Sequence, residues 1–208
     1  MHSSISPHRL LTGCKISFEF GTWIFGELLS SKTRSQYDPV GGDTFEQHEV
    51  YECTRSDKPI KSQHTIKIKR QMNFWSNRDY HEPSDGINRE VENLHRLKSC
   101  TSTPKLIGLR IDNQGPGDDL PGGYIAYIVM QKVPGKGLHN YDELTPRDQN
   151  RVRIAFIDAL WEFRSNHFSH SDPRRENIIW DPETQKWFVW LKSLIECLVT
   201  YATVLLLT

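Results

Sequence analysis

Alternating apolar and polar residues predict strands along the first two thirds of the chain. Residues 49–54 alternate in this way. So do residues 64–69, whose two isoleucines fall on one face and whose polar side chains fall on the other: Thr65, Lys67 and Lys69. A polar loop separates the two runs, so we expect them to form a hairpin. A lysine on the polar face of a strand is normally solvated, and we expect this of Lys67 unless another element supplies a partner.

Three further stretches are predicted strands. Residues 16–29 are rich in Phe, Trp, Ile and Leu, and two glycines interrupt them, so they form one or two strands. Residues 104–111 form a short strand, and residues 124–130 are apolar on both faces, which favours a central, buried strand. Residues 112–123 are dense in Gly, Pro and Asp and are predicted to be a surface loop.

A helix is predicted over residues 84–99, where Ser84 or Asp85 can cap its start. Its apolar residues recur at spacings of three and four and form one stripe: Ile87, Val91, Leu94 and Leu97. Glu90 and Glu92 lie early in this helix, where the helix dipole favours acidic side chains without any further role.

A longer helix is predicted over residues 145–166. Thr145 suits the N-cap, Pro146 the first helical position and Asp148 the third. The helix should bury a stripe of six residues: Val152, Ala155, Phe156, Ala159, Leu160 and Phe163. Residues 178–180 and 186–190 then predict a hairpin.

Composition and charge indicate a globular protein without a dominant field. The 208 residues are 37% hydrophobic and 25% charged, and 26 basic side chains balance 26 acidic ones. No net charge therefore attracts nucleic acid or an acidic membrane. The four cysteines are far apart and form no C-x-x-C pair, which argues against a structural zinc site and favours reduced thiols in a cytoplasmic protein. Residues 1–8 have no apolar core of a secretory signal.

Residues 191–208 differ from the rest of the chain, because one lysine and one glutamate are their only charged residues. The apolar run is shorter than the roughly 20 residues that span a bilayer. We expect a buried or aberrant tail, with a membrane anchor as the alternative.

The motif with the clearest chemistry lies in residues 167–181. His170, Asp172 and Asn177 form H-x-D-x-x-x-x-N ahead of an apolar strand. A carboxylate and an amide at this spacing suit phosphoryl transfer, because one orients a nucleophilic hydroxyl and the other holds a metal ion. Chance alone produces the motif in roughly one chain of this length in a hundred. The competing interpretation, in which His167, His170 and Asp172 bind a metal, lacks the usual additional His or Cys ligands.

The order of these elements resembles the protein kinase-like fold over residues 45–190. The likeness is nearest to fungal-type kinase-like proteins and to aminoglycoside and choline phosphotransferases. It implies an α+β, two-lobe protein with a small antiparallel-sheet N-lobe and an incomplete helical C-lobe. The resemblance divides the chain into an N-terminal extension that can include the first strands (1–44), the N-lobe (45–130), a hinge (131–137), a partial C-lobe with the catalytic loop (138–190) and an aberrant apolar tail (191–208).

The resemblance implies ATP and Mg²⁺ as cofactors and assigns roles to individual residues. Lys67 resembles the strand lysine that contacts the nucleotide phosphates, and Glu90 resembles the helix glutamate that pairs with it, with Glu92 as the fallback. Backbone groups of Gln131 and Val133 would bind adenine at the hinge.

Four residues of the loop receive roles from the same resemblance. Asp172 resembles the catalytic aspartate and Asn177 the metal-binding asparagine. His170 would be structural, and Arg174 would lie near the transferred phosphate. The phosphate acceptor, a protein or a small molecule, is not identified by any residue.

Three departures from the family pattern leave two functions open. No G-x-G-x-x-G is present, and Gly41-Gly42 is read as a turn, with a phosphate cradle as the alternative. Ser171 replaces the arginine of regulated protein kinases, which favours small-molecule or fungal-type kinases. No carboxylate occurs before Glu196 where the family has its second metal ligand. The chain is therefore expected to be a phosphotransferase, or else a pseudokinase or nucleotide-binding scaffold without catalysis. A membrane tether through the tail is a further alternative for the scaffold.

Overall fold

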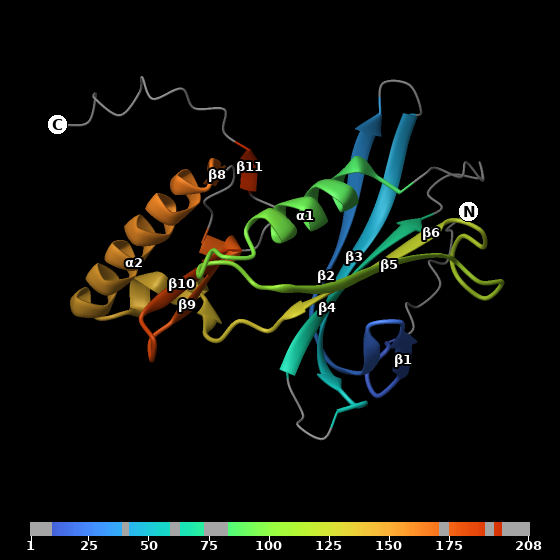
Figure 1. Ribbon diagram of the computed structural model, residues 1–208, viewed down its shortest axis with the longest axis horizontal. Coiled ribbons are helices and arrows are strands. Elements are labelled where there is room, and N and C mark those ends of the chain that lie inside the picture. The colour runs from blue at the N-terminus through green and yellow to red at the C-terminus, as the bar shows by residue number, and fades with distance from the viewer. Residues whose placement is uncertain are drawn as a thin grey trace. The chain divides into compact units, whose positions relative to one another are not determined.

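A computed structural model describes residues 10–38, 42–58, 63–72, 83–170, 175–189 and 194–196. The chain divides into two compact units. The first unit contains residues 1–91 and 106–132, and the second contains residues 92–105 and 133–208. Figure 1 labels α1, α2 and the strands other than β7.

The first unit is built on a six-stranded antiparallel sheet with the order β1-β2-β3-β4-β6-β5. Its strands are β1 (Lys15–Phe18), β2 (Gly21–Asp38), β3 (Gly42–Arg55), β4 (Gln63–Met72), β5 (Leu106–Asn113) and β6 (Tyr124–Gln131). The helix α1 (Asp85–Arg96) begins in this unit and ends in the second.

The predicted strands are present, and most are longer than their apolar patterns. The expected hairpin forms between β3 and β4, with Val50 opposite Lys67. Residues 16–29 contribute to two strands, β1 and β2, and β6 lies between β4 and β5 as a buried strand. Gly42 opens β3, while Gly41 lies outside the described residues.

The apolar core of the first unit lies on the face of the sheet that carries the β4 isoleucines. Ile66 and Ile68 are fully buried there, and two aromatic residues of this core, Phe25 and Tyr51, meet edge to face with their ring centroids 5.3 Å apart. The remaining buried members of this core are Phe18, Trp23, Cys53, Ile125 and Val129.

The opposite face of β4 is buried too, and Lys67 has there the partner that would make it an exception to the rule of solvated strand lysines. Lys67 is only 5% exposed and Lys69 only 2%. The alternation of residues 64–69 identified the two faces correctly, but α1 supplies the partner that the strand pattern alone does not contain.

The second unit contains helix α2 and short strands. Its elements are β7 (Lys136–Gly137), η1 (Leu138–Glu143), α2 (Pro146–Ser165), β8 (Phe168–His170), η2 (Arg175–Asn177), β9 (Ile178–Asp181), β10 (Lys186–Val189) and β11 (Leu194–Glu196). The expected hairpin forms between β9 and β10, and β7 pairs with the other edge of β9. From the predicted apolar tail, β11 pairs with β8, and residues 191–193 and 197–208 lie outside the described part of the chain.

Helix α2 begins as its sequence predicts. Thr145 is the N-cap, and its Oγ1 accepts a hydrogen bond of 3.2 Å from the backbone N–H of Asp148. Phe156 and Phe163 face Trp187 of β10, with ring centroids 4.8 and 6.4 Å away.

The predicted stripe of α2 is only partly buried. Three of its residues are buried and three are half-buried: Val152, Ala159 and Phe163, then Ala155, Phe156 and Leu160. Three other apolar side chains of the helix are more than half exposed: Ile154, Ile157 and Trp161. Among the described residues, no helix is both long enough and apolar enough to cross a membrane.

Candidate functional site

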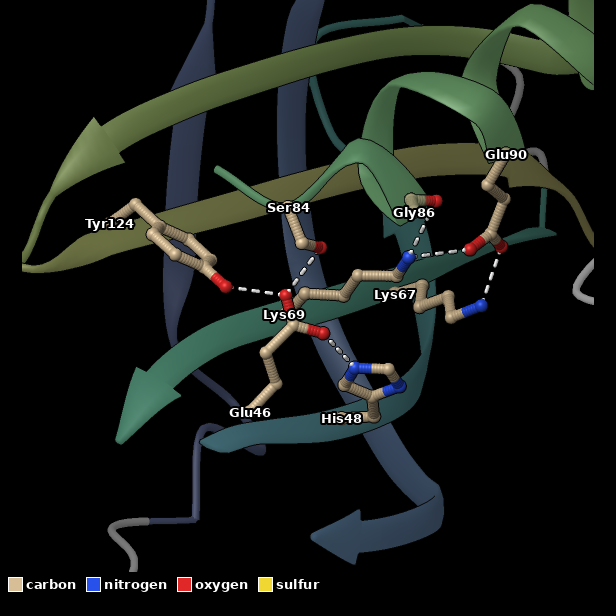
Figure 2. Close-up of polar contacts among 8 residues, drawn as sticks. All are labelled: Glu46, His48, Lys67, Lys69, Ser84, Gly86, Glu90 and Tyr124. Carbon is tan, nitrogen blue, oxygen red and sulfur yellow. Dashed lines mark hydrogen bonds and ion pairs between the residues drawn. The ribbon is translucent and has the colours of Figure 1, made fainter. Parts of the chain in front are cut away.

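The candidate site begins with an ion pair between β4 and α1. Lys67 Nζ lies 2.5 Å from Glu90 Oε1, and both side chains are almost completely buried (Figure 2). The strand presents Lys67 on the face that α1 covers, and Glu90 projects from the second turn of the helix. The pairing that the resemblance implied between these two residues is therefore present. Glu92, the fallback partner, is exposed.

A second lysine shares the same carboxylate. Lys69 Nζ lies 2.9 Å from Glu90 Oε2 and 3.2 Å from the backbone carbonyl of Gly86. Because residues two apart on a strand face the same side, Lys67 and Lys69 approach Glu90 together. Sequence reasoning placed Lys69 on this face but assigned it no partner.

Burial and the neighbouring charges shift the pKa values of Glu90 and Lys67. Burial by itself raises the pKa of Glu90, but the positive charges of Lys67 and Lys69 outweigh it and bring the pKa to about 2. Burial lowers the pKa of Lys67, and the opposing attraction of Glu90 does not cancel this effect. A buried lysine with a lowered pKa is a hallmark of functional sites, although structural ion pairs show it as well.

A carboxylate network lies on the same face of the sheet, at the start of α1 (Figure 2). Glu46 Oε1 accepts hydrogen bonds from the hydroxyls of Tyr124 at 2.5 Å and Ser84 at 2.7 Å. Its Oε2 accepts one from Nε2 of His48 at 2.5 Å. Burial raises the pKa of Glu46, but these bonds outweigh it and bring the pKa to about 2. Glu46 is therefore ionised at neutral pH.

Sequence analysis missed this network because its members are spread over the chain. Glu46 and Tyr124 are 78 residues apart, and Glu46 and Ser84 are 38 apart. The only local signal is the spacing of Glu46 and His48, which places both on one face of β3.

The residues expected at the hinge lie at the end of β6 and beyond it. Gln131 is the last residue of β6, is exposed and pairs with His64, while Val133 follows in a coil of the second unit. Gly135 has a φ of 102°, and a side chain there would collide with the carbonyl of Trp180. Only glycine suits this position.

The residues of the H-x-D-x-x-x-x-N motif are only partly described. His170 ends β8, and Asn177 ends η2 and is half-buried, directly before β9. Asp172 and Arg174 lie in residues 171–174, outside the described part of the chain. Asp181, after the motif, closes the β9–β10 turn, where it accepts hydrogen bonds from Glu183 N and Thr184 Oγ1.

In the part of the chain that the structure describes, no group of three or more His, Cys, Asp or Glu side chains could hold a metal ion. The proposed trio of His167, His170 and Asp172 falls partly outside that part, because Asp172 is not described. Asn177, to which the resemblance assigns a metal-ligand role, is among the described residues.

Comparison with known proteins yields a structural neighbour. No protein-family model matches the chain, and no curated protein does. Among solved structures, the chain is similar to the Cydia pomonella granulovirus kinase PK-1, with 17% identity and a TM-score of 0.47. The match covers 80% of this chain and 50% of that kinase, so the chain spans about half of its length. The described strands and helices by themselves make the chain a mixed, sheet-rich protein.

Proposed function

We propose that this chain is a kinase-like phosphotransferase domain that transfers the γ-phosphate of ATP to a hydroxyl group of a protein or small molecule. The observation that carries the proposal is the buried ion pair between Lys67 and Glu90. A buried lysine is costly unless it is paired, and a carboxylate from a helix orients it better than solvent does. Such a lysine can donate hydrogen bonds to phosphate oxygens while the carboxylate holds its position.

The other residues complete the proposed roles. Asp172 orients the acceptor hydroxyl, and Arg174 neutralises charge near the transferred phosphate, with His170 shaping the loop. Backbone groups of Gln131 and Val133 bind adenine. In this proposal residues 45–130 form the N-lobe, 131–137 the hinge and 138–190 the partial C-lobe. Ser171 favours a small-molecule or fungal-type kinase.

The donor set suits the nucleotide better than it suits the metal ion. Lys67 supplies a cation for the phosphates, and Asn177 supplies one oxygen ligand for Mg²⁺. Between Phe188 and Ile195 the sequence has no carboxylate to serve as a second ligand. A bound Mg²⁺ would neutralise phosphate charge, but one protein ligand would hold it weakly.

That missing carboxylate favours a second candidate, a pseudokinase or nucleotide-binding scaffold. It would use Lys67 and the hinge to bind ATP without transferring the phosphate. The thiols of Cys14, Cys53 and Cys100 are free, which favours a reducing, cytoplasmic setting for either function. A membrane tether through residues 191–208 is tested by deleting them, because an anchored protein would change its fractionation.

The two candidates are separated by nucleotide titration and turnover. The phosphotransferase binds ATP more tightly with Mg²⁺ and, with water in place of the acceptor hydroxyl, hydrolyses ATP to ADP and phosphate. Asp172→Asn abolishes this release of ADP while leaving ATP binding intact. Lys67→Met weakens ATP binding at least tenfold in either case. Binding that is indifferent to Mg²⁺, with no ADP released, selects the scaffold. Turnover that survives Asp172→Asn, or ATP binding that survives Lys67→Met, contradicts the proposed roles.

A further inference from the structure

The buried polar face beneath α1 contains a second lysine, Lys69, to which the proposed nucleotide site assigns no role. One carboxylate, that of Glu90, is shared by Lys67 and Lys69 through its two oxygens, at 2.5 and 2.9 Å. Burying a second lysine costs several kcal/mol unless it is well paired. The role of Lys69 is therefore to be sought in its own contacts.

The contacts of Lys69 differ in kind from those of Lys67. Lys67 has one contact with α1, through the Glu90 side chain. Lys69 has two, to the Glu90 carboxylate and to the backbone carbonyl of Gly86 at 3.2 Å. In an α-helix the carbonyl of residue 86 accepts the N–H of residue 90. Lys69 thus binds both ends of a single helical turn, the turn from which Glu90 projects.

Other described residues also contact the start of α1. The described apolar cluster there consists of Ile87, Tyr124 and Ala126, with Leu109 packed against it. Just before the helix, the hydroxyl of Ser84 donates a hydrogen bond to the carboxylate of Glu46. The fully buried Ile87 contributes substantially to the stability of this end of the helix, and the charged contacts of Lys69 add to this hold.

We propose that Lys69 is a positioning residue that holds the first turns of α1 on the sheet, so that Glu90 keeps its carboxylate on Lys67 whether or not a ligand is bound. The role of Lys67 in binding ATP rests on the proposed function. The contacts by which Lys69 fixes α1 on the sheet do not depend on that function. Lys69 touches no nucleotide in this arrangement: it acts through Glu90. Removing Lys69 leaves the Lys67–Glu90 pair neutral and intact, so the folded protein should tolerate its loss.

The test measures backbone hydrogen exchange and ATP affinity in the full chain. The variants are Lys69→Met and Lys67→Met, with Lys15→Met as the control, because Lys15 is exposed on β1. Without nucleotide, Lys69→Met should exchange the amides of α1 about tenfold faster, as expected for the loss of one charge-assisted hydrogen bond to Gly86 and one ion pair with Glu90. Lys67→Met should leave α1 within about twofold of the wild type. Exchange in β3 is the internal reference for global unfolding.

ATP affinity then separates positioning from direct contact. Lys69→Met should weaken ATP binding about tenfold, and Lys69→Arg should restore part of both readouts. Unchanged exchange of α1 in Lys69→Met overturns the proposal, as does equal loosening by Lys67→Met. If the wild type binds no ATP but Lys69→Met still loosens α1, the positioning role stands and the proposed function fails. Should Lys69→Met not fold, the neutral but polar Lys69→Gln is judged by the same criteria.

Discussion

Replacing Glu90 by glutamine tests the electrostatic account of the buried face most directly. The substitution keeps the shape of the side chain and one hydrogen-bond acceptor but removes the negative charge. Lys67 and Lys69, which now share the carboxylate at 2.5 and 2.9 Å, would lose the anion that contacts both of them, and the weaker attraction of Glu46 for Lys67 would remain. Breaking a buried ion pair in this way costs about 3 to 5 kcal/mol. This is a large share of the about 5 to 15 kcal/mol by which a domain is stable.

The pH dependence of this loss distinguishes charge from packing. Burial already lowers the pKa of Lys67, and without Glu90 the pKa falls further. The unfolded chain, whose lysines titrate near pH 10.4, then binds more protons than the folded chain, so stability rises with pH. Glu90→Gln should therefore recover part of its lost stability between pH 7 and pH 10.

Urea unfolding at pH 7 and at pH 9.5 measures both effects, with Glu92→Gln as the matched control. Glu92 lies on the same helix and is exposed, so its substitution should change the free energy of unfolding by less than about 0.5 kcal/mol. Equal losses in the two variants would refute the reasoning. A loss in Glu90→Gln that stays constant with pH would show that the lysines are not its cause.

Three further predictions concern other contacts. Stability should fall as the pH drops from about 4.5 toward about 2, where Glu46 gains its proton in the folded state, and Glu46→Gln should flatten this part of an acid-unfolding curve. Gly135→Ala should lower the thermal midpoint, because the φ of 102° costs about 1 to 2 kcal/mol and the added carbon meets the Trp180 carbonyl, whereas Gly117→Ala, with open space around it, should not. Glu162→Ala should cost about 1 to 3 kcal/mol in urea unfolding, since its carboxylate accepts hydrogen bonds from two backbone amides and two hydroxyls of residues 101–102.

Local patterns in the sequence were sufficient for the main strands and both α-helices and for the start of α2. The N-cap of α2 at Thr145 depends on residues within one turn, and the structure has it as predicted. The pairing of β3 with β4 follows from two alternating runs joined by a short loop. Such features involve neighbours in the chain, whose interactions a periodic pattern already contains.

The polar halves of β2 and β3 were not predictable from that pattern. Residues 30–38 and 42–48 are mostly polar, yet they continue the hairpin beyond its apolar part. Their pairing comes from the strand across the sheet rather than from an apolar face of their own, so alternation carries no signal for it.

Only the tertiary structure decided the character of the candidate site. The sequence placed Lys67 and Lys69 on one face of β4, but whether that face meets water or a helix depends on contacts across 17 to 23 residues of chain. The burial of both lysines and the sharing of Glu90 arise when α1 is laid on the sheet, and Glu46 is ionised because His48, Tyr124 and Ser84 meet it there. Burial and charge are properties of the assembled surroundings, and no stretch of residues contains them by itself.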